Sequence, residues 1–288
     1  MRCQRAPAHA SSDGGVSGGF KSDMGAQYID PMTLCHVCHR WQAHAVCEDC
    51  ISAFAQPQPR CPLCALPQTV ASTSLRVHAP SSPPPCPCAR IAPVYAQDMA
   101  PETPLLDRCI AALDYAYPWS DCITRLKFGH DVGLAQTLAR LMQHTPWAER
   151  ELEQADRIIP MPLSPERLQE RGFNQVLELA KHLAHPHIDI DSLQRWPTSA
   201  HQVGADRSQR WQQVRERFWL APARIAGLKG QRIVLLDDVM TTGATLYAAA
   251  HTLRRAGVSH LTALVLARTP MASLTDNARH VQHRAGSS

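Results

Sequence analysis

Residues 234–245, which read VLLDDVMTTGAT, hold the side chains best suited to chemistry in this chain. An apolar, strand-like run ends at two adjacent carboxylates, and small residues with hydroxyl groups lead from there into a helix. Backbone N–H groups at a helix start bind a dianionic phosphate, and ionised carboxylates accept hydrogen bonds from the vicinal hydroxyls of a ribose. The pattern therefore predicts a ribose-phosphate site; the alternative is that the aspartates only cap the helix and the threonines only shape the turn. The residues expected at this site are Asp237, Asp238, Val239, Met240, Thr241, Thr242, Gly243, Ala244 and Thr245.

The eleven cysteines indicate a second kind of chemistry, because eight of them form four close pairs. A Cys-x-x-Cys turn presents two thiolates, and two such pairs complete a closed, structural Zn²⁺ site. In a chain without a recognisable secretory signal, such pairs are more typical of metal binding than of disulfides; reduced thiols or a redox pair are the alternatives. We expect consecutive pairs rather than crossed pairs to share a metal, and the second site is the less well specified because its last pair has a single intervening residue. The expected ligands are Cys35, Cys38, Cys47, Cys50, Cys61, Cys64, Cys86 and Cys88.

The elements that position the carboxylates follow a strand, turn, helix, strand order. A strand over 233–236 precedes the acidic pair, a helix over 246–255 stops at Gly257, and a second strand covers 261–267. Helical spacing also occurs over 126–141 and 174–183, and a short apolar run covers 157–163. A strand-helix-strand unit predicts an α/β fold with a parallel sheet flanked by helices and a binding edge at the strand C-termini.

Length and composition place these elements in a globular chain of 288 residues, enough for about two domains. The net charge of +4 is too small to indicate a nucleic-acid-binding protein by itself. No apolar run reaches the roughly 18 residues of a membrane span, and the beginning of the chain lacks the apolar core of a signal peptide, so we expect a cytoplasmic protein with no membrane span. The expected units are a disordered tail over 1–30, a small cysteine-rich zinc-binding module over 31–92, an α/β domain over 105–270 and a flexible tail over 271–288.

Residues 234–245 resemble the phosphoribosyl pyrophosphate (PRPP) motif of type I phosphoribosyltransferases, an apolar run followed by two acids and T-T-G-x-T. Other segments are similar to those of the ComF family of competence-associated phosphoribosyltransferase-like proteins, which includes GntX and carries an N-terminal double zinc ribbon. These segments are L-K-F at 126–128, I-P-M-P-L at 159–163, R-G-F-N-Q at 171–175, R-T at 268–269, and the spacing of Gln202, Arg207, Arg210 and Phe218. The chain departs from the family at Met161, where Val is common, and at 212–213, where Gln-Gln replaces Arg-Asn. The resemblance covers about residues 33–270.

The resemblance implies a type I phosphoribosyltransferase-like domain that displaces pyrophosphate from the anomeric carbon of PRPP. It implies that Asp237 and Asp238 contact the ribose as the catalytic pair, that the following loop surrounds the 5′-phosphate, and that Mg²⁺ is chelated by the ligand itself. It also implies partners in the competence machinery that takes up DNA. The sequence does not identify the acceptor substrate. The alternative is a non-catalytic accessory protein that binds PRPP, another ribose phosphate or single-stranded DNA. The residues expected near the pyrophosphate are Pro160, Met161, Pro162, Lys127, Arg167 and Arg171.

Residues 195–232 form a basic segment, with eight Lys and Arg against two acids and three interleaved tryptophans. Basic grooves with stacking rings bind single-stranded nucleic acid without reading its sequence. A phosphate-facing loop with a solvated helix, in which the tryptophans anchor the core, explains the same composition, and we favour this second interpretation. The candidate nucleic-acid contacts are Arg207, Arg210, Trp211 and Arg215.

Overall fold

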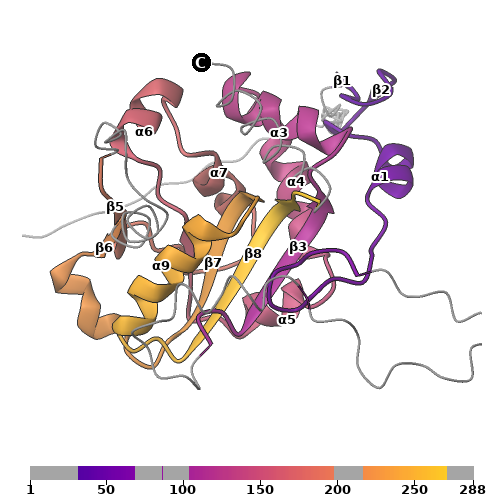
Figure 1. Ribbon diagram of the computed structural model, residues 1–288. Coiled ribbons are helices and arrows are strands. Elements are labelled where there is room, and N and C mark those ends of the chain that lie inside the picture. The colour runs from indigo at the N-terminus through magenta and orange to yellow at the C-terminus, as the bar shows by residue number, and fades with distance from the viewer. Residues whose placement is uncertain (1–31, 69–85, 87–103, 198–216, 271–288) are drawn as a thin grey trace, which may run out of the picture.

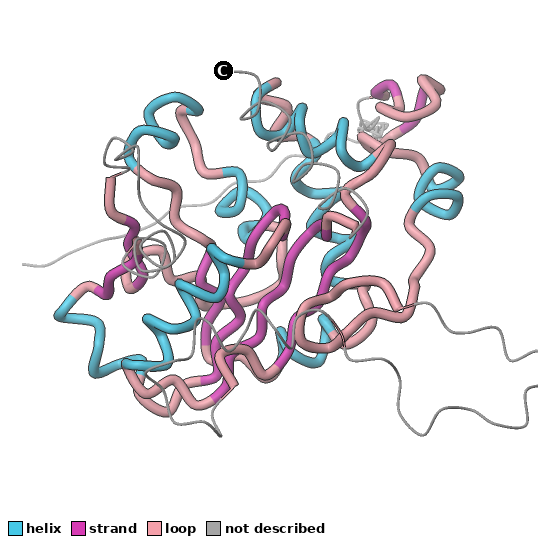
Figure 2. The backbone as a smooth tube through the Cα atoms, in the orientation of Figure 1, coloured by secondary structure: helices cyan, strands magenta, loops and turns pink. Residues whose placement is uncertain are grey.

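The computed structural model describes residues 32–68, 86, 104–197 and 217–270. Its centre is a four-stranded, all-parallel sheet with the order β3-β8-β7-β4, drawn as neighbouring arrows in Figure 1 and in magenta in Figure 2. The sheet and its flanking helices confirm the predicted fold class. The strands are β3 (Arg108–Asp114), β4 (Arg157–Pro160), β7 (Arg232–Met240) and β8 (His260–Arg268).

The two central strands, β7 and β8, are apolar on both sides. Residues 233–236 and 261–267 are all buried, which is the pattern of a parallel strand covered by helices on both faces. β7 continues to Met240, whereas the sequence predicted that it ends at the acidic pair. The reason is that Asp237, Val239 and Met240 still pair with β8, opposite Val265, Ala267 and Arg268.

Helices cover both faces of the sheet. On one face lies α9 (Ala244–Arg255), which buries Leu246 and Leu253 against the sheet and also contacts β6. On the other face lie α4 and α7, whose buried side chains include Leu138 and Leu179. None of the described helices has the length and apolar content needed to cross a bilayer. Besides α9, the described helices that follow the cysteine segments are α3 (Trp119–Phe128), α4 (Leu134–Gln143), α5 (Ala148–Glu153), α6 (Pro165–Arg171), α7 (Gln175–Lys181) and the 3-10 helix η2 (Pro222–Leu228).

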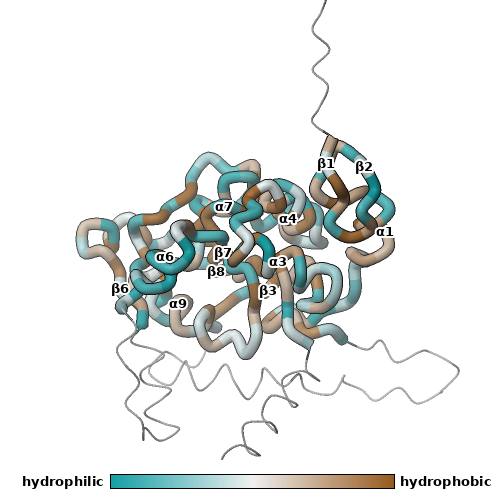
Figure 3. Tube along the Cα trace, turned by 90° about the horizontal axis from the view of Figure 1, so that it is seen from above, coloured by the Kyte–Doolittle hydropathy of each residue, from teal (hydrophilic) through white to brown (hydrophobic). Residues whose placement is uncertain are grey.

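The first cysteine segment contains β1 (Thr33–Leu34), β2 (Trp41–Gln42) and α1 (Glu48–Phe54), which Figure 3 shows together at one side of the molecule. It is attached to α3, because the indole Nε1 of Trp119 donates a hydrogen bond of 2.9 Å to the carbonyl oxygen of Phe54. Four residues at the second Cys-x-x-Cys turn belong to the same buried cluster as α9, namely Cys61, Cys64, Ala65 and Leu66. The cysteine segments therefore pack directly on the two faces of the α/β unit.

A short antiparallel pair, β5 (Leu193–Arg195) and β6 (Phe218–Leu220), lies beside α9 and apart from the main sheet (Figure 1). Residues 198–216, between these strands, lie outside the described residues. They contain the four candidate nucleic-acid contacts, so those predictions stay untested. The two predicted tails and the predicted ligand Cys88 also lie outside the described residues.

Candidate active site

Asp237 and Asp238 lie near the carboxyl end of β7, at the edge of the sheet where open α/β folds bind their ligands. Oδ1 of Asp237 accepts a hydrogen bond of 2.9 Å from the backbone N–H of Asp238. Burial, and then repulsion from the Asp238 carboxylate, raise the pKa of Asp237 to about 7, against the opposing effect of Lys127 and Arg195. A hydroxyl group that donates a hydrogen bond to this carboxyl would favour its ionised form.

Asp238 is 5% exposed and is held from two sides. Its Oδ2 lies 3.0 Å from Nζ of Lys127 and accepts a hydrogen bond of 2.6 Å from Nε2 of Gln175. Gln175 in turn accepts a hydrogen bond of 2.9 Å from Arg171. Seen from above in Figure 3, α3, α6 and α7 gather around the ends of the central strands. The Lys127 ammonium and the Gln175 amide therefore hold one carboxylate of the pair in place.

The loop after β7 presents backbone donors. The N–H groups of Thr241, Thr242 and Gly243 have no hydrogen-bond acceptor among the residues that the structure describes, and both threonines are exposed. Gly243 has a φ of +82°, which places it in the left-handed region immediately before α9. A Cβ at this position would lie 2.5 Å from Cε of Met240 and 2.9 Å from Cε2 of Tyr247. The loop thus requires glycine, and its free N–H groups at a helix start can hold an anion.

Residues 160–164 form a second loop at the same edge. The N–H of Met161 donates to the carbonyl oxygen of Leu236 at 2.8 Å, and Asn174 Nδ2 donates to the carbonyl oxygen of Met161 at 3.1 Å. Ser164 is fully buried, yet its hydroxyl has no hydrogen-bond partner in the described part of the chain, and neither has Nε of Arg171. Buried polar groups are normally paired, so these two are available to a ligand or to water.

One arginine of β5 belongs to the electrostatic surroundings of Asp237. Arg195, at the end of β5, interacts electrostatically with Arg167, Arg217 and Asp237; burial and the two neighbouring guanidinium groups lower its pKa. Within the described ranges Arg195 has no ion pair, and its guanidinium lies 5.5 Å from the ring centre of Phe218. Cations crowded in this way favour binding of a polyanion.

The structure brings several of the predicted residues to this edge, and their predicted roles stay predictions. Lys127, a pyrophosphate candidate, pairs with Asp238, and Arg171, another candidate, contacts Gln175. Val239 and Met240 belong to β7, whereas Ala244 and Thr245 form the first turn of α9. Pro160 ends β4, and Met161 and Pro162 follow it.

Sequence reasoning did not identify Gln175 or Arg195 as site residues. Gln175 is the last residue of the R-G-F-N-Q motif, so the motif held a signal that could have identified it. Arg195 had no local signal, because its neighbours in the site come from α6, β6 and β7.

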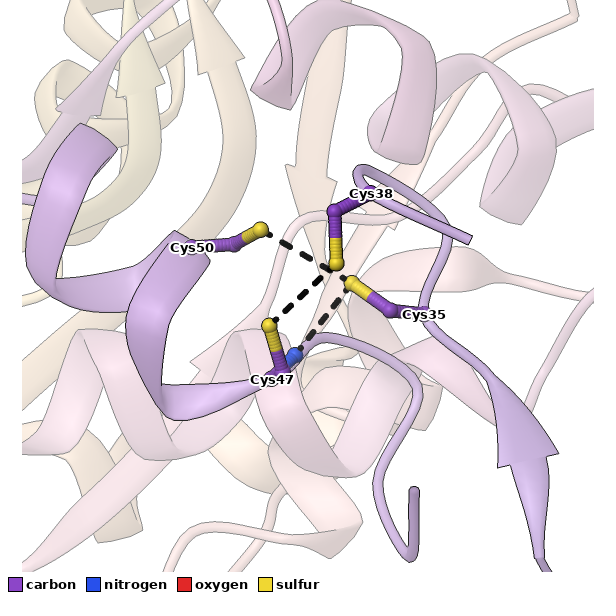
Figure 4. A group of neighbouring side chains, drawn as sticks. All are labelled: Cys35, Cys38, Cys47 and Cys50. Atoms are coloured by element: carbon purple, nitrogen blue, oxygen red, sulfur yellow. Dashed lines mark hydrogen bonds between the residues drawn. The ribbon is translucent and has the colours of Figure 1, made fainter. Parts of the chain in front are cut away.

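The first cysteine cluster has the geometry of a metal site (Figure 4). All four sulfur atoms of Cys35, Cys38, Cys47 and Cys50 lie within 4.8 Å of one another, with Cys38 and Cys47 at 3.6 Å and Cys35 and Cys50 at 3.9 Å. Sulfur ligands placed 2.3 Å from a tetrahedral Zn²⁺ ion lie about 3.8 Å apart. Burial disfavours the Cys35 thiolate, but backbone N–H groups, among them that of Val37, outweigh burial and lower its pKa to about 6. This cluster could hold a metal ion.

The second cluster joins Cys61 and Cys64 to Cys86, again with all sulfur atoms within 4.8 Å of one another. The Cys64 and Cys86 sulfurs are 3.3 Å apart. These three thiols also suit a metal ion, and both groupings are those expected if consecutive cysteine pairs share a site.

Comparison with known proteins shows what the chain is similar to. Residues 178–282 match the family model of the phosphoribosyl transferase domain. The chain is 30% identical over 245 residues to DNA utilization protein YhgH of Salmonella typhimurium, covering 83% of this chain and 94% of that protein. For the protein of the same name from Escherichia coli K12, the identity is 29% over 245 residues, covering 82% and 97%. Competence protein F of Haemophilus influenzae is 32% identical over 174 residues, covering 58% of this chain and 75% of that protein. The chain belongs to the ComF family.

The phosphoribosyl transferase match in this ComF-family protein begins within α7 and includes β7, the loop, α9 and β8. The acidic pair and the free N–H groups therefore lie within the matched residues, on the fold that the resemblance implied.

Proposed function

We propose that this ComF-family protein binds PRPP with Mg²⁺ at residues 237–245 and transfers the phosphoribosyl group to an acceptor, releasing pyrophosphate. The observation that carries the proposal is the position of Asp237 and Asp238 next to the free N–H groups of Thr241 and Thr242, at the carboxyl edge of a parallel sheet. Carboxylates for two ribose hydroxyls and donors for a phosphate are thus one short loop apart.

In the proposed reaction, the acceptor's lone pair forms a bond to the anomeric carbon while the bond from that carbon to the pyrophosphate oxygen breaks. The electron pair of the broken bond leaves with pyrophosphate, and the acceptor loses its proton. Mg²⁺ bound with PRPP would neutralise part of the phosphate charge. The chain's own contribution is to hold the ribose through the acidic pair and to offer Arg167, Arg195 and the loop over 160–164 to the leaving group.

We also propose that the two cysteine clusters hold structural Zn²⁺. The sulfur spacing of 3.6–3.9 Å in the first cluster supports this assignment. Sites whose ligands are all protein thiolates leave no open position for catalysis. Thiols persist in a reducing compartment, which agrees with a cytoplasmic protein.

The test is pyrophosphate release from Mg-PRPP with a panel of nitrogenous bases and nucleophiles. We expect release by the wild-type protein, and loss by at least about a hundredfold in the double variant Asp237→Asn/Asp238→Asn, since several transition-state contacts disappear together. Asp191→Asn is the matched control, because Asp191 is an exposed carboxylate paired with Arg224 on the surface. Unchanged release in the double variant would contradict the assignment of the site.

A second candidate function is single-stranded DNA binding without catalysis. Trp196, directly after Arg195 and β5, and Trp219, within β6, have ring centres 5.3 Å apart, and Trp196 is 53% exposed. The relatives' names, DNA utilization protein and competence protein, support a role in DNA uptake or use. Binding should weaken steeply with salt, and neutralising Arg207, Arg210 and Arg215 should reduce the salt slope. An unchanged slope would exclude that segment from the contact.

A further inference from the structure

One buried arginine joins the second cysteine cluster to the loop over 241–243 after β7, which we call the phosphate loop. Arg268 ends β8 and is 2% exposed. Its Nε donates to the carbonyl oxygen of Cys64 at 2.8 Å. Its Nη1 donates to the carbonyl oxygen of Met240 at 2.9 Å and also to that of Thr241. A single guanidinium therefore contacts a metal-ligand residue on one side and two loop peptides on the other.

These contacts determine which way the loop amides face. The C=O and N–H of a trans peptide point in opposite directions. When the carbonyls of Met240 and Thr241 turn toward Arg268, the N–H groups of Thr241 and Thr242 turn away from it. These are the exposed N–H groups that lack an acceptor in the described part of the chain. Arg268 thus orients two donors assigned to the 5′-phosphate.

Two further contacts connect the same parts. The hydroxyl of Tyr247, in the first turn of α9, donates a hydrogen bond of 3.3 Å to the carbonyl oxygen of Leu63, which lies between Cys61 and Cys64. The N–H of Cys109 donates to the carbonyl oxygen of Pro62 at 2.6 Å, and its thiol lies 3.5 Å from Sδ of Met240. The Cys61–Cys64 turn and the phosphate loop are therefore linked by these contacts as well as by Arg268, and displacement of one disturbs the other.

The charge of Arg268 also fits a metal–thiolate neighbour. Among the described residues no carboxylate pairs with this guanidinium. Three or four thiolates around a divalent ion leave a net negative charge, which would compensate a buried cation.

We propose that Arg268 is a positioning residue that couples the Cys61/Cys64/Cys86 cluster to the phosphate loop, so that a metal ion in the cluster and PRPP in the loop strengthen each other's binding. The proposal rests on the proposed function, because it requires PRPP to bind at the loop. Coupling of this kind is reciprocal: PRPP must protect the cluster by the factor by which the metal ion strengthens PRPP binding.

The first experiment uses the wild-type protein. Cysteine alkylation by iodoacetamide in the presence of a chelator, followed by peptide mass spectrometry, reports each cluster separately. We expect saturating Mg-PRPP to slow alkylation of Cys61 and Cys64 about fivefold or more, the lower end of usual coupling factors, with a smaller effect on Cys35. The Asp237→Asn/Asp238→Asn variant in the same Mg-PRPP controls for zinc chelation by the ligand itself.

The second experiment compares two conservative variants. Arg268→Lys keeps the positive charge, but a lysine ammonium cannot span the four carbonyls that the guanidinium contacts, those of Cys64, Met240, Thr241 and Thr269. Arg254→Lys is the matched control, since Arg254 is 7% exposed and donates to the carbonyl oxygens of Leu105, Val258 and Ser259 at the opposite end of β8. We expect both variants to keep their metal and to lose similar stability. Only Arg268→Lys should bind PRPP about tenfold more weakly and lose the protection of Cys61 and Cys64.

The outcomes of these experiments distinguish the coupling through Arg268 from the proposed binding of PRPP. Wild-type protein that binds PRPP without any change in alkylation of Cys61 and Cys64 would overturn the coupling and leave the proposed function intact. An affinity loss in Arg268→Lys no greater than in Arg254→Lys would do the same. If Arg268→Lys fails to fold, the wild-type measurement decides alone. Folded wild-type protein that binds no PRPP would overturn both the proposed function and this inference.

Discussion

At the scale of single residues, the two carboxylates of the pair differ in environment. Asp238 forms an ion pair with Lys127 and accepts a hydrogen bond from Gln175, so its charge is compensated. Asp237 is half-buried next to that charge, and its pKa is raised to about 7. The protonation of Asp237 therefore responds to a ligand near neutral pH.

This difference predicts a pH-dependent stability. The pKa of Asp237 is about 7 in the folded chain, against an ordinary value of 3.8, so the folded state binds this proton more tightly than the unfolded state. Its contribution to the free energy of unfolding therefore falls as pH rises from about 4 to about 7, and the loss is complete above the folded pKa. We expect Asp237→Asn to be more stable than wild type at pH 8 by at least about 1 kcal/mol, the equivalent of one pKa unit, and to lose that advantage at pH 4.

Urea unfolding of both proteins across this range measures the difference, and histidine titration cancels because both proteins contain the same histidines. Asp191→Asn, on the surface, should follow wild type throughout. An advantage of Asp237→Asn that does not change with pH would show that Asp237 has an ordinary pKa.

At the scale of elements, the sequence was most informative where local pattern and packing agree. The strands β7 and β8 and the helix α9 were predicted because a buried parallel strand and its crossover helix carry their own apolar periods. β3 was not predicted, since its sequence RCIAALD has no clear alternation and becomes a strand by pairing with β8. β5 and β6 have three residues each and pair across a long sequence separation, so no local pattern marks them.

The candidate site was also predictable only where a local sequence pattern marks its residues. The acidic pair and Gly243 were predicted from one contiguous motif. The contacts of Lys127, Gln175 and Arg268 depend on where α3, α7 and β8 meet in space, which no short motif encodes.

The position of α3 makes a testable prediction. Its Lys127 is 16% exposed and pairs with the buried Asp238, so Lys127→Met leaves a buried carboxylate without its cation. We expect a loss of about 2 kcal/mol in the free energy of unfolding, together with weaker PRPP binding. Lys181→Met is the matched control, because Lys181 pairs with Glu178 while it is 53% exposed, and should cost less than about 0.5 kcal/mol. Equal losses in the two variants would show that the Lys127 pair is not a buried one.

At the scale of the whole molecule, the cysteine segments share their packing with the sheet. Cys35, Val46 and Cys50 belong to the same buried cluster as Ile123 and Leu126 of α3. Cys61, Cys64, Ala65 and Leu66 belong to the cluster beneath α9. Loss of metal from either cluster should therefore affect both layers around the sheet.

Chelation tests this dependence. We expect the purified protein to hold about two Zn²⁺ ions, one for each cluster. Removing them under reducing conditions should lower the midpoint of a single thermal transition by at least about 5 °C, because metal-ligand energy contributes to folding and the cysteine segments pack on the sheet. Calorimetry distinguishes this result from two transitions. A separate transition of the cysteine segments, with the sheet transition unmoved, would mean that they fold independently.

The central claim is that residues 237–245 bind PRPP, and calorimetric titration of Mg-PRPP into metal-loaded protein tests it most directly. We expect one binding site per chain in the wild-type protein. Gly243→Ala should bind at least about tenfold more weakly, since a Cβ there meets Met240 and Tyr247 at 2.5 and 2.9 Å. Gly230→Ala should bind normally, because Gly230 has a similar positive φ of +75° with no atom within 4 Å of the added Cβ. Folded wild-type protein that gives no binding heat at millimolar Mg-PRPP, or Gly243→Ala that binds as tightly as Gly230→Ala, would contradict the account.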